Sequence, residues 1–121
     1  MAYRTYTLPV LTASGTPSGS AAGTVTSFEP IVGEIKAIYF GYSGTATTTD
    51  VAVVRAATGG TILSVANSVT SGWFYPSVAL NDGTAGARTA YSGVPVVEYL
   101  RATLAQGSAG DTLSTTVIVE F

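Results

Sequence analysis

The sequence predicts an all-β fold, a jelly-roll-like β-sandwich of about eight short antiparallel strands. Apolar residues recur at every second position in one stretch after another, and turns rich in glycine, proline and serine separate the stretches. No stretch shows a convincing helical pattern. At 121 residues, the chain is long enough to bury a core of its own, so we expect one β-sandwich domain over residues 1–121.

The N-terminal part begins with a predicted strand over Tyr3–Leu11, where Tyr6, Leu8 and Val10 share one face. The next segment, Ala13–Gly23, contains only Gly, Ser, Thr, Pro and Ala. It has almost nothing to bury, so residues 13–23 are expected to form a flexible loop. The alternative is an arm that becomes ordered against a neighbouring subunit.

The strongest predicted strand is Glu34–Tyr42. Ile35, Ala37 and Tyr39 are expected on one face, with Phe40 on the other. Ile38 and Tyr42 should join Phe40. Since both faces are apolar, this strand is expected at the centre of a sheet, covered on both sides. The remaining clear strands, two of them joined as a hairpin by Gly59-Gly60, are Thr24–Phe28, Asp50–Ala57, Thr61–Ala66, Val78–Leu80 and Leu113–Phe121.

The stretch Val94–Ala105 fits two periods. Val97, Leu100 and Leu104 have helical spacing, whereas Val96, Leu100 and Leu104 also fit an alternating strand. We predict a strand, because the neighbouring stretches are all strands.

Three consecutive aromatic residues, Trp73, Phe74 and Tyr75, stand before Pro76. In a strand, Trp73 and Tyr75 share one face and Phe74 lies on the other. Pro76 cannot donate to a sheet ladder, so the stretch belongs at a sheet edge or a strand end.

Trp73 has the largest side chain and one N–H to satisfy, so Trp73 and Tyr75 are expected to point into the sandwich, with Phe74 toward a neighbouring element or subunit. Burial of both faces within one domain stays open. Because aromatic residues are enriched in interface cores, the candidates for a protein interface are Phe74, Trp73, Tyr75, Phe40 and Tyr42.

Residues that carry catalysis are scarce. The chain has no histidine and no cysteine, and its seven carboxylates show no spacing that selects a catalytic pair. Asp82 and Asp111 stand in turn-forming contexts. We therefore expect no enzyme, no catalytic residue, no cofactor, no metal site and no small-molecule substrate.

The charge pattern bears on partners. The formal net charge is −2 and the five basic residues are scattered, so no nucleic-acid partner is expected. No apolar run approaches the length of a membrane helix, so no membrane partner is expected either. Charged residues make up 10% of the chain, against about 25% in an average domain. Such a surface is either rich in threonine, serine and glycine and inert, or partly covered in an assembly. Because exposed valine-rich edges and apolar strands are a risk on a free monomer, we expect a compact dimer or trimer that buries part of an aromatic face.

A series of short motifs runs from Gly33 to Phe121: Gly-Glu-Ile-Lys-Ala-Ile, Thr-Asp-Val-Ala-Val, a Gly-Gly turn, Trp-Phe-Tyr-Pro, Tyr-Leu-Arg-Ala-Thr and Gly-Asp-Thr before a valine-rich last strand. This order resembles the small capsid decoration, or cement, proteins of tailed bacteriophages. The resemblance implies a jelly-roll-like fold, an oligomer that binds the major capsid protein and stabilises the shell, and no catalysis. It places the protein in the virion, on the capsid exterior, after synthesis in the host cytoplasm.

Two other functions stay open. In a carbohydrate-binding or receptor-binding β-sandwich module, Trp73 and Tyr75 would form a stacking platform for sugar rings. A tail-tube or tail-fibre component would instead form rings or helical assemblies. The sequence leaves open whether any loop binds glycans or a metal ion.

Overall fold

The computed structural model describes residues 2–15, 20–44, 48–67, 70–76, 78–81 and 87–121. None of these residues forms a helix that could cross a membrane. They form strands and turns, and the strands are β1 Tyr3–Thr7, β2 Leu11–Thr12, β3 Ala21–Thr26, β4 Ile31–Ser43, β5 Asp50–Arg55, β6 Thr61–Val65, β7 Gly72–Phe74, β8 Val78–Asn81, β9 Ala87–Ser92, β10 Val94–Glu98, β11 Leu100–Gly107 and β12 Thr112–Glu120.

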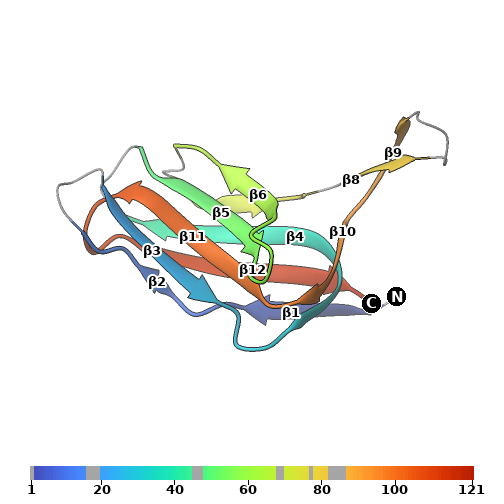
Figure 1. Ribbon diagram of the computed structural model, residues 1–121, viewed down its shortest axis with the longest axis horizontal. Coiled ribbons are helices and arrows are strands. Elements are labelled where there is room, and N and C mark those ends of the chain that lie inside the picture. Colours follow the sequence, from blue (N-terminus) through green and yellow to red (C-terminus); the bar gives the residue numbers. More distant parts are fainter. Residues whose placement is uncertain (1, 16–19, 45–47, 68–69, 77, 82–86) are drawn as a thin grey trace.

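Two antiparallel sheets pack face to face, and Figure 1 shows one in front of the other. The six-stranded sheet has the order β1-β12-β4-β10, with β2 added to β12 and β7 added to β4. The four-stranded sheet has the order β3-β11-β5-β6. Because the chain crosses repeatedly from one sheet to the other, the sandwich has jelly-roll wiring. The predicted fold class is confirmed.

The core lies between the two sheets. In β12, Leu113, Val117 and Val119 are buried while Ser114 and Thr116 face outward, which confirms the alternation predicted for the last strand. The hairpin of β5 and β6 through Gly59-Gly60 is also as expected. Burial of this apolar layer stabilises the fold by about 25 cal/mol per Å² removed from water. Its largest buried side chains are Phe40, Leu8, Leu11, Ile31, Ile35, Ile38, Leu100, Leu104 and Leu113.

The single strand predicted over Tyr3–Leu11 is in fact two, β1 and β2. Tyr6 and Leu8 are buried as expected, but Val10 is exposed and Leu11 is buried instead. The inward positions therefore change from even to odd numbers. Pro9 stands at the break, where its missing N–H and fixed φ interrupt the ladder.

The faces predicted for β4 need one correction. Ile35 lies in the core together with Ile38 and Phe40, not on the face of Tyr39. The pairing with β12 shows why, since Ile118 lies opposite Ala37 and Val119 opposite Ile35, with a bulge between them. The extra residue reverses the alternation beyond it. The strand is central as predicted, with β12 on one side and β10 or β7 on the other.

The segment 13–23 is only partly loop. Its last residues, Ala21–Gly23, belong to β3, and both Ala13 and Ala21 are buried. Ser14 and Ala22 exchange two backbone hydrogen bonds of 3.0 Å. Alanine is small enough to fit between the sheets, so this composition does not exclude a strand. Residues 16–19 lie outside the described part of the chain.

The stretch Val94–Ala105 is extended, as predicted, but it forms two strands. β10 pairs with β4, whereas β11 lies in the other sheet between β3 and β5, and Tyr99 stands at the crossing. The strand predicted over Val78–Leu80 is present as β8, but it pairs with β9 in a separate two-stranded sheet. Figure 1 shows this ribbon projecting from the sandwich.

Candidate functional site

The aromatic stretch adds the short strand β7 to one side of β4. Ile38 pairs with Phe74, and Tyr39 pairs with Trp73. Because Ile38 and Phe40 face the core, the pairing turns Phe74 inward as well. The Phe74 ring packs against that of Phe40, with their centroids 5.8 Å apart. Trp73 consequently points to the outer face of the six-stranded sheet.

The predicted orientation of the aromatic stretch is therefore wrong. Trp73 is 46% exposed and Tyr75 is 71% exposed, whereas Phe74 is half-buried against the core. The alternation itself was correct, since Trp73 and Phe74 do lie on opposite faces. The size of the tryptophan did not decide which face is buried. The register with β4 decided it.

We call Tyr39, Trp73 and Tyr75 the aromatic surface. The rings of Tyr39 and Trp73 have centroids 5.2 Å apart and planes tilted by 56°, which is a favourable geometry for an aromatic pair. Gly41, two residues after Tyr39 on the same face, makes room for this arrangement. A Cβ atom at Gly41 would lie 3.2 Å from Cε2 of Tyr39 and 2.5 Å from Oγ of Ser114.

Small hydroxyl side chains continue this outer face beyond the aromatic surface. Thr116 of β12 pairs with Tyr39, and Thr7 of β1 pairs with Thr116. Ser114 lies beside Gly41 and donates a hydrogen bond of 3.4 Å to its carbonyl oxygen. The residues next to Thr116, Thr115 and Val117, are buried, so Thr116 itself faces outward. The outer face of the sheet therefore carries aromatic rings on β7 and β4 and hydroxyl groups on β12 and β1.

The same face carries a charged cluster farther along β4 and β12. Nζ of Lys36 lies 3.1 Å from Oε1 of Glu34 and 3.6 Å from Oε1 of Glu120. The hydrogen bond from Lys36 lowers the pKa of Glu34, and the Gly93 N–H, 2.7 Å from the same oxygen, adds to this effect. The hydrogen bond to Glu34 in turn raises the pKa of Lys36. Lys36, the only cation of this cluster among the described residues, thus forms ion pairs with two carboxylates.

The other interface candidates lie deeper. Phe40 is wholly buried and offers no surface to a partner. Tyr42 is partly buried and donates a hydrogen bond of 2.6 Å to Oδ2 of Asp111, while its hydroxyl lies 3.0 Å from Oγ1 of Thr49. Asp111 is a turn residue as expected, since its backbone N–H binds the Ser108 carbonyl, but its carboxylate is also buried. Asp82 lies outside the described residues.

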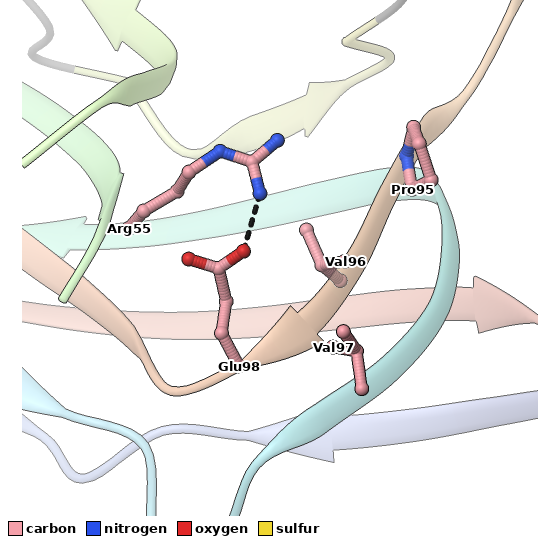
Figure 2. A pocket seen from close by; sticks show the side chains of 5 residues that line it. All are labelled: Arg55, Pro95, Val96, Val97 and Glu98. Atoms are coloured by element: carbon pink, nitrogen blue, oxygen red, sulfur yellow. Dashed lines mark hydrogen bonds and ion pairs between the residues drawn. The ribbon is translucent and has the colours of Figure 1, made fainter. Parts of the chain in front are cut away.

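A shallow pocket of about 260 Å³ lies on another part of the sandwich. Figure 2 shows Arg55 and Glu98 pointing toward each other across it, beside Pro95, Val96 and Val97. Arg55 comes from the four-stranded sheet and Glu98 from the six-stranded sheet, so their ion pair ties the two sheets together. The charge of the arginine is paired with that of Glu98, which favours a structural role.

Comparisons with known proteins identify a similar fold. No family model matches the sequence, and no curated protein matches it. A solved structure from the xylanolytic gut symbiont Roseburia intestinalis, described as a new low affinity xylan binding module, CBM86, has a TM-score of 0.55 and 12% sequence identity. The match covers 99% of this chain and 96% of that chain. At this identity, the similarity establishes a shared fold.

This finding corrects the resemblance to bacteriophage capsid decoration proteins. The similar structure is a xylan-binding module and not a capsid protein. The resemblance rested on packing and turn motifs, such as the Gly-Gly turn and the valine-rich last strand, which any β-sandwich can contain. The expected capsid partner and virion location were implied by that resemblance alone.

The sequence drew attention to Trp73 and Tyr75 as a stacking platform, and the structure places both at the surface. The sequence did not identify Tyr39 as a surface residue, because its strand was expected to be covered on both faces. The signal was nevertheless present, since Tyr39 alternates with the buried Ile38 and Phe40. Thr116 and Gly41 gave no signal of their own, because only the strand register brings them beside Tyr39.

Proposed function

We propose that this protein is a carbohydrate-binding β-sandwich module, and that the aromatic surface is its binding site. The observation that carries the proposal is the pair of the partly exposed Tyr39 and the exposed Trp73 on the outer face of a sheet, with the exposed Tyr75 nearby. The similarity of the whole fold to a module described as binding xylan supports it.

The chemistry of the surface suits a sugar. One face of a pyranose ring is lined by C–H groups and its edges carry hydroxyls, so it matches an aromatic ring beside polar side chains. Tyr39 and Trp73 supply the aromatic rings. The Thr116 hydroxyl can donate and accept hydrogen bonds, and the Ser114 hydroxyl, which donates to Gly41, can still accept one. The rings already touch each other in the free protein, so little side-chain entropy is lost on binding.

The site is proposed to bind and not to hydrolyse. A glycosidase needs one carboxylic acid and one carboxylate facing each other across the scissile bond. The two described carboxylates on this face, Glu34 and Glu120, both hold Lys36 instead. Moreover, Glu120 stands four residues along β12 from Thr116, which corresponds to about 13 Å of strand.

The direct test is a titration with soluble xylan, mixed-linkage glucan and mannan. Trp73 is the only tryptophan, so its fluorescence reports on the aromatic surface without any label. An open, shallow surface predicts weak binding, with a Kd of about 0.1–1 mM. We expect binding to change the Trp73 emission with the same Kd that calorimetry gives. If no glycan changes the emission or gives heat at millimolar concentration, the proposal is wrong.

A pair of variants locates the site. Trp73→Ala should weaken glycan binding by at least about tenfold in affinity electrophoresis, or about 1.4 kcal/mol. Phe28→Ala is the matched control, because Phe28 is a 76%-exposed aromatic residue in the turn between β3 and β4, away from β7. It should bind like the parent. Equal loss in both variants would show that binding does not depend on the aromatic surface.

A further inference from the structure

We infer that the bound glycan runs across the strands, from Trp73 over Tyr39 to Thr116 and Thr7, and that it is an uncharged chain of several sugars. This inference rests on the proposed function and adds the direction and the chemical class of the ligand. The two threonines are then specificity-determining residues that contact the sugars beyond the aromatic rings.

The strand register sets these four residues in one row. Trp73 pairs with Tyr39, Tyr39 with Thr116, and Thr116 with Thr7, so the row crosses β7, β4, β12 and β1. Neighbouring strands lie about 4.8 Å apart, so three steps span about 14 Å. This spacing is comparable to the repeat of an extended β-linked sugar chain. Each strand can therefore meet one successive sugar.

All four side chains of the row lie on the outer face. Trp73 and Thr7 are exposed, and Tyr39 and Thr116 are partly exposed. Each stands beside residues that face the core: Phe74 next to Trp73, Tyr6 next to Thr7, and the buried pairs that flank Tyr39 and Thr116. The row is thus a continuous strip in which ring faces give way to hydroxyl groups.

A glycan parallel to the strands would find a poorer surface. From Tyr39 and Thr116, the outer face continues to the buried Ala37 and to Ile118, which carry no hydroxyl group. Beyond these residues lies the cluster of Lys36 with its two carboxylates. In the opposite direction the outer face continues to Gly41 and Ser114, but the Ser114 hydroxyl already donates its hydrogen bond to the Gly41 carbonyl. The row across the strands instead sets the hydroxyls of Thr116 and Thr7 in line with the aromatic rings.

The charges on this face favour a neutral ligand. Lys36 is bound by Glu34 and Glu120, so the cluster carries one excess negative charge and offers no unpaired cation to a uronic acid or a sulfate. A threonine hydroxyl can donate one hydrogen bond and accept others, as a sugar hydroxyl does, and needs no charge on the ligand.

The test measures how affinity depends on ligand length. Xylo-oligosaccharides and cello-oligosaccharides, from the monosaccharide upward, are titrated against the parent, Thr116→Val, Thr7→Val and Thr5→Val. Thr5 is the matched control, because it is exposed on the same face of β1 but pairs with Ile118, outside the row. Trp73 fluorescence is read in every protein.

The parent and Thr5→Val should bind longer chains progressively more tightly until the row is filled. Thr116→Val should lose about three- to tenfold in affinity for the long chains only, since the shortest ligands occupy only the aromatic rings. Thr7→Val should show a smaller loss at the longest lengths. Unchanged length dependence in both variants would overturn the direction across the strands while leaving carbohydrate binding intact.

Two further results are decisive. An oligogalacturonate that binds more tightly than a neutral chain of equal length would overturn the neutral class. If the parent binds none of these oligosaccharides at millimolar concentration, both the inference and the proposed function are wrong. If the parent binds them but the threonine variants behave like the parent, only the inferred direction of the glycan is wrong.

Discussion

The rings of Trp73 and Tyr39 touch because their residues pair directly across β7 and β4, with centroids 5.2 Å apart. β4 is the central strand of its sheet, so Tyr39 stands on the most firmly held part of the molecule. β7 has three residues and pairs with β4 alone. The position of Trp73 therefore depends on how β7 is anchored, and Phe74 is that anchor.

Phe74→Ala should lower the free energy of unfolding by about 2–4 kcal/mol, because it removes a half-buried ring that packs on Phe40 and leaves a cavity at the edge of the core. Trp73→Ala should lower it by about 1 kcal/mol or less, because that ring is largely exposed and mainly loses its contact with Tyr39. Urea unfolding measures both. A larger loss for Trp73→Ala would mean that the two faces are assigned the wrong way round.

Gly41→Ala should disturb the aromatic surface without unfolding the protein. The added methyl group would lie 2.5 Å from Oγ of Ser114, so that hydroxyl must move. It would also lie 3.2 Å from the Tyr39 ring, which must give by a few tenths of an ångström and thereby changes its contact with Trp73. We expect glycan affinity to fall about three- to tenfold while the unfolding free energy falls by about 1 kcal/mol or less.

Gly72→Ala is the control for this change, since a methyl group at Gly72 would meet no atom of the described residues within 4 Å, its two chain neighbours aside, although the residue precedes Trp73. It should leave binding and tryptophan emission unaltered. If Gly41→Ala binds glycans like the parent, Gly41 has no part in placing Tyr39.

Local patterns predicted much of this fold because alternation is a property of single strands. β12 shows it without interruption, and the β5–β6 hairpin follows from its Gly-Gly turn. Features that depend on the pairing of two strands could not be predicted in this way. The bulge between Ile118 and Val119 reverses the faces of β4, yet it appears only when β4 is laid against β12.

The aromatic surface was predictable only in part, for the same reason. Alternation places Trp73 and Phe74 on opposite faces of the strand, but it does not tell which of the two faces is buried. The pairing of Phe74 with the buried Ile38 decides this. Likewise, Thr116 and Thr7 are ordinary threonines in the sequence, and only the register across β12 and β1 sets them in line with Tyr39.

Thr115→Val should raise the free energy of unfolding by about 1 kcal/mol. Thr115 is 1% exposed, opposite Phe40, and its hydroxyl has no hydrogen-bond partner among the described residues. A buried hydroxyl without a partner costs free energy, and valine replaces it with a methyl group of the same shape. Urea unfolding measures the change, with Thr116→Val on the outer face as the matched comparison. Destabilisation by Thr115→Val would show that the hydroxyl does bind a buried water.

Stability should fall in acid partly through Glu34. Its pKa is lowered from the usual 4.5, chiefly by the hydrogen bond from Lys36 and next by the Gly93 N–H. A carboxyl group with a lowered pKa binds fewer protons in the folded state than in the unfolded state. Its contribution to stability is therefore complete above pH 4.5 and disappears as the pH falls toward the lowered value. Lys36, whose pKa is raised from 10.5, stays charged throughout this range.

The measurement is the difference in Tm between the parent and Glu34→Gln as the pH is lowered from about 7 to about 3, because the other carboxylates titrate in both proteins and cancel in the difference. Glutamine keeps an oxygen that can accept the Gly93 N–H but cannot carry the charge that holds Lys36. The parent should be the more stable protein near pH 7, by a small amount because the pair is partly exposed. The two Tm curves should then converge as the pH falls below 4.5. Curves that stay parallel to the acid limit would show that the pairing of Glu34 with Lys36 adds nothing to folding.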